Sequence, residues 1–183
     1  YLVEQKYGKA IVAFKKAVRL NDLFAEAYKG LADAYRAKGD DDRCQEYLQK
    51  AAEVHAQFDR LEEAKSSFIE ALQFSEDIPN PFNSLGVKLR KQGDYPGALH
   101  AYHQALELTP KDEHIYFNIA KAYYYMGDFK LAGEYVVKAL DQLPTFEEAG
   151  KLHKRVFGKP HEPPVTAPAD IKTAGESRSA KDI

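Results

Sequence analysis

The sequence predicts an all-α protein, a solenoid of about four to five antiparallel helix pairs followed by a disordered tail. Two observations predict this fold: small and helix-breaking residues recur at one fixed spacing, and apolar residues inside each repeat follow helical spacing. The spacing is clearest between the segments that begin at Pro79 and Glu113. When these are aligned, four pairs of residues coincide 34 positions apart: Gly93 with Gly127, Ala98 with Ala132, Ala105 with Ala139 and Pro110 with Pro144.

Each such repeat contains two predicted helices joined by a tight turn. In the 79–112 unit the apolar stripes are Phe82, Leu85, Gly86 and Leu89 on the first helix, and Ala98, Tyr102, Ala105 and Leu106 on the second. A Gly-Asp pair separates them, because Gly can adopt the left-handed conformation that ends one helix and Asp can cap the next. The same turn occurs at 38–40, 92–94 and 126–128, and Pro110 and Pro144 close their units.

Small residues at matching positions predict where the helices come closest. Antiparallel helices approach each other only where side chains are small, so Gly86, Ala98 and Ala132 mark helix interfaces. The aromatic residues Tyr102 and Tyr123 are expected to fill the gaps between units. One unit cannot bury its apolar face alone, so neighbouring units must stack.

The N-terminal part continues the pattern with one phase break. The predicted units lie near 2–22, 25–58 and 59–78, the last one irregular, followed by the regular units 79–112 and 113–146. Gly39 and Gly93 are 54 positions apart, which is one period plus 20, so about one helix is missing from regular alternation. The helix over 41–58 is therefore expected to pack against partners on both sides, with Cys44 as a small core residue.

The C-terminal end is predicted to close the solenoid. Residues 145–148 have the pattern of a capping box, which predicts a capping helix over 145–157 and a solenoid domain of residues 1–157. Residues 158–183 are rich in Pro, Ala, Ser, Thr and charge, with too few large apolar residues to offset the entropy of ordering, so we predict a disordered tail. The chain starts at Tyr1 in the middle of a repeat, and we interpret it as a fragment of a longer protein.

Composition excludes several classes of protein. The 183 residues carry a formal net charge of −2 and no long run of Lys or Arg, which argues against a nucleic-acid partner. There is no apolar run long enough for membrane insertion. The single cysteine excludes an intrachain disulfide.

The motifs now identify a family. The Leu-Gly-x-x-Leu stretch at 85–89, Gly-Asp-Tyr at 93–95, Ala-x-x-x-Tyr-x-x-Ala-Leu at 98–106 and the closing Pro resemble the tetratricopeptide-repeat (TPR) family. The resemblance covers residues 2–157 and is most specific over 79–144. It implies a right-handed superhelix whose concave face is lined by the first helix of each unit, and a non-enzymatic scaffold that binds a protein or peptide.

The predicted peptide-binding groove combines basic, amide and aromatic side chains. These suit a ligand with acidic groups, because amides can bond its backbone, aromatic rings can pack on its apolar side chains, and Lys or Arg can pair with its carboxylates. The alternative is that they are ordinary solvated residues, with Phe117 and Tyr124 packing against the next unit. The twelve predicted groove residues are Asn83, Val87, Arg90, Lys91, His114, Phe117, Asn118, Lys121, Tyr124, Tyr125, Lys151 and Arg155.

One type of TPR groove is not expected. A subfamily of the resembling domains grips chaperone C-termini with Lys, Asn, Asn, Lys and Arg. The matching positions in this sequence are Asn83, Val87, Asn118, Glu148 and Leu152, and only Asn118 agrees.

No catalytic, cofactor or metal site is predicted. His100 and His103 share a helix face but have no further ligand at metal-binding spacing, so we interpret them as surface histidines. Gly-rich phosphate loops, nucleophile elbows and zinc-binding helix motifs do not occur in the sequence.

Two other functions stay open from the sequence. The first is an oligomerisation or spacer segment, since incomplete repeats create apolar edges that can self-associate. The second is the output or docking region of a bacterial two-component response regulator, because the stretches 80–86 and 112–118 are similar to TPR regions of bacterial multidomain signalling proteins. A cytoplasmic location is expected, and the periplasm stays open because the N-terminus is missing.

Overall fold

The computed structural model describes residues 2–75 and 78–158, and within these residues every regular element is an α-helix. The all-α prediction is confirmed, whereas residues 159–183 of the predicted tail lie outside the described residues. The nine helices of the described residues are α1 (Leu2–Leu20), α2 (Ala25–Arg36), α3 (Asp41–Gln57), α4 (Leu61–Leu72), α5 (Pro81–Lys91), α6 (Tyr95–Leu108), α7 (Glu113–Met126), α8 (Phe129–Gln142) and α9 (Glu147–Phe157).

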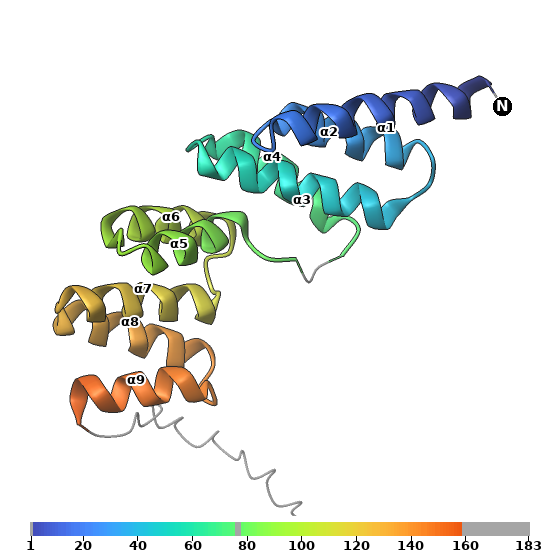
Figure 1. Cartoon of the computed structure of the whole chain (residues 1–183). Helices are drawn as coiled ribbons and strands as arrows, with labels where there is room; N and C mark the ends of the chain where they lie inside the picture. The colour runs from blue at the N-terminus through green and yellow to red at the C-terminus, as the bar shows by residue number, and fades with distance from the viewer. Residues whose placement is uncertain (1, 76–77, 159–183) are drawn as a thin grey trace, which may run out of the picture.

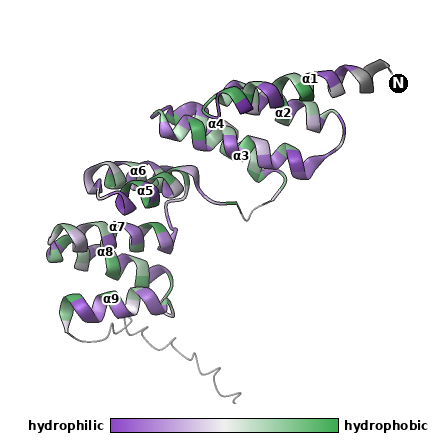
Figure 2. Cartoon of the chain, in the orientation of Figure 1, coloured by the Kyte–Doolittle hydropathy of each residue, from purple (hydrophilic) through white to green (hydrophobic). Residues whose placement is uncertain are grey.

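The helices stack in sequence order into a superhelical solenoid. Consecutive helices pack on each other from α1 to α4 and again from α5 to α9. Helix α3 also packs on α5 and so joins the two series. Figure 1 shows α1–α4 at one end of the stack and α5–α9 at the other. In Figure 2 the helices carry both hydrophobic and hydrophilic residues along their length, as expected for helices that bury one face.

The repeated Gly-Asp turn has the predicted geometry. The glycines adopt the left-handed conformation, with φ of 71° at Gly39, 85° at Gly93 and 81° at Gly127. The following aspartates cap the next helices: Asp40 accepts from the Arg43 N–H, Asp94 from the Gly97 N–H and Asp128 from the Leu131 N–H, at 3.2, 3.0 and 3.0 Å. Identical local chemistry therefore sets the same helix-to-helix reversal three times.

Small residues lie at the helix interfaces, as predicted. Ala98 and Ala132 are completely buried. A Cβ placed on Gly86 would lie 2.4 Å from Cε1 of Tyr102, so the absence of a side chain at Gly86 lets α6 approach α5. The prediction for Tyr102 needs correction, because its ring covers Gly86 of its own unit rather than only filling the space before the next unit.

Helix α3 resolves the phase break in the repeat. Near its start, Cys44 and Leu48 belong to the N-terminal hydrophobic cluster with Leu31 of α2. Near its end, Ala56 belongs to the next cluster with Phe82 of α5. Burial at this place raises the pKa of the Cys44 thiol. Helix α3 thus packs against helices on both sides, as the 54-residue spacing predicts.

The start of α9 differs from the prediction. The predicted capping box is wrong, because Phe146 occupies the N-cap position and no side chain accepts a hydrogen bond there. The Phe146 side chain is instead buried against Phe117, with ring centroids 4.9 Å apart. Packing of this ring therefore fixes where α9 begins, and Thr145 is left exposed in the preceding turn. Among residues 2–75 and 78–158, no helix has the length and apolar character needed to span a bilayer.

Candidate functional site

The first helices α5 and α7 bring five of the predicted residues together. We call Asn83, Arg90, Lys91, Asn118 and Lys121 the central cluster. Its amides are in direct contact, since Nδ2 of Asn118 donates to Oδ1 of Asn83 at 3.0 Å. Both amides are half-buried, so the hydrogen bond joins α5 to α7 at a surface that water still reaches.

Lys121 is the electrostatic centre of the cluster. Its side chain is half-buried, and burial together with the charge of Arg90 lowers the pKa of Lys121 below its usual range. The charge of Lys91 also lowers the pKa of Lys121, whereas the carboxylate of Glu148 on α9 raises it. The ammonium group thus lies in a position where positive charge is only partly compensated.

Arg90 is held by a neighbour on the second helix of its own unit. Its Nε donates to the Tyr102 hydroxyl at 3.4 Å. Burial raises the pKa of Tyr102, so its phenol stays neutral and does not neutralise the guanidinium. No carboxylate of the described residues forms an ion pair with Arg90.

Phe117 forms an apolar patch beside the cationic group of Lys121. Nζ of Lys121 lies 5.2 Å from the Phe117 ring centroid. Phe117 also packs against Phe146 and the hydrophobic cluster to which Phe146 belongs, and it stays half-buried. Phe117 is therefore partly a packing residue, as the alternative interpretation proposed, and partly accessible next to Lys121.

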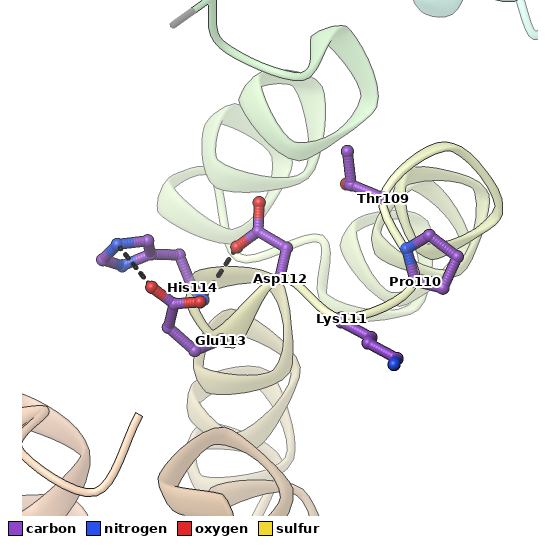
Figure 3. Close-up of a pocket in the computed structure, with 6 residues that line it drawn as sticks. All are labelled: Thr109, Pro110, Lys111, Asp112, Glu113 and His114. Carbon is purple, nitrogen blue, oxygen red and sulfur yellow. Dashed lines mark hydrogen bonds and ion pairs between the residues drawn. The ribbon is translucent and has the colours of Figure 1, made fainter. Parts of the chain in front are cut away.

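His114 lies at the start of α7, beside a different feature. Its ring contacts Phe146 edge-on at 4.9 Å, and its Nε2 lies 3.6 Å from Oε1 of Glu113. Figure 3 shows the loop of residues 109–114 that leads into α7, with Asp112 bonded to the His114 backbone. A cavity of about 550 Å³ is lined by this loop alone. It contains the predicted groove residue His114 but none of the central cluster, so the cavity and the central cluster are separate features.

Three predicted groove residues pack elsewhere. Val87 packs against the hydrophobic cluster around Phe82. Tyr124 packs against the cluster of α7, α8 and α9, with its ring 5.4 Å from that of Phe129. Tyr125 is exposed and stacks on Tyr95 at 6.2 Å. Their helical spacing places them on α5 and α7 but does not bring them into the central cluster.

Helix α9 contributes charged residues of both signs. Lys151 and Arg155 are exposed, and Nζ of Lys151 lies 3.5 Å from Glu147. The predicted set omitted Glu148, although its carboxylate acts on Lys121. It also omitted Tyr102, which holds Arg90. The signal for Glu148 was its position in the first turn of α9, the helix that follows α8 and is two helices beyond α7 in the stack.

The histidines on α6 have ordinary surface partners. Nε2 of His100 lies 3.1 Å from the Asp59 carboxylate, and the His103 ring packs edge-on against Tyr135 at 6.2 Å. In the described part of the chain there is no group of three or more His, Cys, Asp or Glu residues arranged to hold a metal ion.

Three family models match the sequence. A model described as TPR repeat matches residues 88–127, and two described as Tetratricopeptide repeat match residues 113–142 and 1–53. The matches lie in both the N-terminal and the C-terminal half of the stack.

Several crystal structures are similar to this chain. The APC/C hetero-tetramer Cut9-Hcn1 gives 20% identity and a TM-score of 0.42 over 84% of this chain, which spans 40% of the length of that one. YrrB, a TPR protein with an unusual peptide-binding site, gives 21% identity and 0.39, covering 82% of this chain and 84% of that one. PilW, a widely conserved type IV pilus biogenesis factor, gives 19% identity and 0.40, covering 86% and 81%.

Proposed function

Because the chain belongs to the tetratricopeptide-repeat family, we propose that it is a non-enzymatic scaffold for protein–protein interaction that binds an acidic peptide or protein segment across α5, α7 and α9. The observation that supports this most directly is the central cluster. Arg90, Lys91 and Lys121 bring three cations together on two neighbouring helices, and within the described part of the chain Glu148 is the one carboxylate that acts on Lys121.

The charge balance favours an anionic ligand. Burial and two like charges make the protonated form of Lys121 less favourable than it is in water. A ligand carboxylate placed between Lys121 and Arg90 would relieve this repulsion and accept charge-assisted hydrogen bonds, which are about twice as strong as neutral ones. An acidic side chain of the ligand is therefore the group that the cluster recognises in our proposal.

The paired amides supply contacts to a ligand backbone. Each Asn side chain has two N–H donors and one acceptor oxygen. The Asn118–Asn83 hydrogen bond uses one donor of Asn118 and the oxygen of Asn83, which leaves the amino group of Asn83 and the oxygen of Asn118 for a peptide backbone. Phe117 lies beside Lys121 and offers an apolar contact for a neighbouring ligand side chain.

A binding assay with charge-reversed variants tests the proposal. A panel of fluorescent peptides rich in Asp and Glu is titrated with the wild-type chain, with Lys121→Glu and with the matched control Lys138→Glu, whose site on α8 is exposed. We expect a peptide that binds the wild type and the control equally but binds Lys121→Glu at least about tenfold more weakly, because an attraction becomes a repulsion. Equal binding to all three proteins would place the site elsewhere.

The finer interpretations remain proposals as well. They are the division into the units near 2–22, 25–58, 59–78, 79–112 and 113–146 with a capping helix over 145–157, self-association as an oligomerisation or spacer segment, an output role in a bacterial response regulator, and a cytoplasmic location. Analytical ultracentrifugation tests self-association. The gene sequence upstream of the codon for Tyr1 tests the last two, because a receiver domain or a secretion signal is easily distinguished.

A further inference from the structure

Helix α1 is far more basic than the rest of the chain. Its 19 residues include five cations and one acid, Glu4, although the whole chain has a formal net charge of −2. None of the five cations forms an ion pair with a carboxylate of the described residues. They are Lys6, Lys9, Lys15, Lys16 and Arg19.

The outer face of α1 also exposes large apolar side chains. Ile11, Phe14 and Val18 pack into the N-terminal hydrophobic cluster with α2, and none of the described residues packs on the opposite face of the helix. On that face Val12 is 69% exposed and Leu20 is 80% exposed. These two residues are eight positions apart, so they lie in one row along the helix, with Lys16 between them.

A cavity follows this row. Its volume is about 600 Å³, and it is lined by Val12, Lys15, Lys16, Arg19 and Leu20. The lining thus combines two apolar side chains with three cations. Figure 2 shows that hydrophilic and hydrophobic residues both occur along α1.

The basic surface continues from α1 onto α3 through Lys15. Nζ of Lys15 lies 5.7 Å from the Tyr35 ring centroid, and the Arg43 guanidinium lies 5.0 Å from the same centroid. A hydrogen bond to Tyr35 raises the pKa of Lys15, so both groups stay charged. Asp40 forms an ion pair with Arg43, with Oδ2 of Asp40 3.3 Å from Nε of Arg43, and it forms none with Lys15.

We propose that the outer face of α1 is a second interaction surface, which binds an acidic amphipathic helix of a partner protein. The apolar side chains of that helix pack on Val12 and Leu20, and its carboxylates pair with Lys16, Arg19 and Lys15. A helix is the appropriate shape because the helices of this stack pack side by side on one another. This surface is separate from the central cluster on α5 and α7.

Charge decides between this partner and two other occupants. A second copy of the chain, stacked through its opposite end, would present Lys130, Lys138, Glu134 and Phe157 around the other terminal apolar cavity, so two of its three charged side chains would repel the cations of α1. A lipid surface is disfavoured because Val12 and Leu20 alone make a smaller exposed apolar face than membrane-surface helices carry. A partner that carries carboxylates beside apolar residues satisfies both features of the surface.

Two matched peptides test the proposal. Each is a synthetic helix of about 16 residues with Leu along one face; one has Glu on both flanks and the other has Lys. Fluorescence anisotropy measures their binding to the full chain, to Lys16→Glu/Arg19→Glu, and to the control Lys130→Glu/Lys154→Glu at the opposite end. All four substituted side chains are exposed, and circular dichroism checks that each variant is folded.

We expect the Glu peptide to bind the wild type and the control, and to bind Lys16→Glu/Arg19→Glu about tenfold or more weakly. The Lys peptide is expected to show the reverse preference, and raising the salt concentration should weaken both interactions. The inference is overturned if the wild type binds neither peptide or binds both alike. It is also overturned if the chain dimerises through Val12 and Leu20 in sedimentation, or binds anionic phosphatidylserine vesicles in preference to the Glu peptide.

Discussion

Replacing Gly86 with Ala should destabilise the protein, although the same change inside a helix usually stabilises it. Ala is favoured over Gly in a helix interior by about 0.5–1 kcal/mol. At Gly86, however, the new Cβ would lie 2.4, 2.6 and 2.9 Å from three ring carbons of Tyr102. Carbon atoms in good contact lie about 3.5–4.0 Å apart, so the ring or the helix must move by about 1 Å.

The Tyr102 ring has little room to move. It is completely buried within the cluster that includes Phe82, Ile115 and Ile119, and interiors of this kind are close-packed. Overpacking a core costs about 1–3 kcal/mol. After subtraction of the gain in helix propensity, the net loss in the free energy of unfolding should be about 1 kcal/mol.

Gly150 provides the matched control. It lies inside α9, and a Cβ at this position has no atom within 4 Å. Gly150→Ala should therefore stabilise the protein by about 0.5–1 kcal/mol. Because helix propensity is common to both changes, the difference between the two variants isolates the overpacking term of about 1–3 kcal/mol.

Urea denaturation followed by circular dichroism at 222 nm measures both variants against the wild type. For a chain of this size, 1 kcal/mol corresponds to about 2–4 °C in melting temperature, so thermal unfolding gives a second reading. If Gly86→Ala stabilises the protein as much as Gly150→Ala does, the contact between Gly86 and Tyr102 does not limit how closely α5 and α6 approach.

Two further outcomes follow from the caps and from the buried histidine. Asp94→Ala removes the acceptor for the Gly97 N–H and should lower the free energy of unfolding by about 1 kcal/mol in urea titration; an unchanged midpoint would contradict the capping role. Burial lowers the pKa of His55, whose Nδ1 has no hydrogen-bond partner among the described residues. The folded protein therefore binds a proton at His55 less readily than the unfolded chain does. The free energy of unfolding is highest above about pH 6.5, where His55 is neutral in both states, and it decreases as the pH falls below that value. The urea midpoint should decrease between about pH 7 and pH 5 in the wild type and should change less in His55→Leu, whereas parallel pH profiles would refute this assignment.

The sequence predicted the elements of the fold because their signals are local. The Gly-Asp turns determine where the helices reverse, and the recurring Ala residues fix which faces meet. The role of Phe146 could not be read in this way, because it depends on contact with Phe117, 29 positions earlier. The capping-box pattern predicts that Thr145 caps α9, whereas the buried ring of Phe146 places Phe146 at the N-cap instead.

The sequence predicted which helix face each site residue lies on, but it did not predict how deeply each residue is buried. Helical spacing placed Asn83, Asn118 and Lys121 on the first helices, and the structure brings them together. The same spacing also selected Val87 and Tyr124, which pack into hydrophobic clusters. How far a residue on the edge of a stripe is buried depends on the size of its neighbours on other helices, and spacing along one helix does not contain that information.

Helix α3 limits how this array can change in length. A regular array gains or loses whole units because each unit contacts only its neighbours. Here α3 is shared, so deleting the helices on either side of it would expose buried residues such as Leu48 or Ala56. We therefore expect the fold to tolerate duplication or removal of units among the regular pairs from α5 onward. Duplication or removal of a unit that includes α3 should unfold the protein, so the number of helices around α3 cannot vary as it can elsewhere in the array.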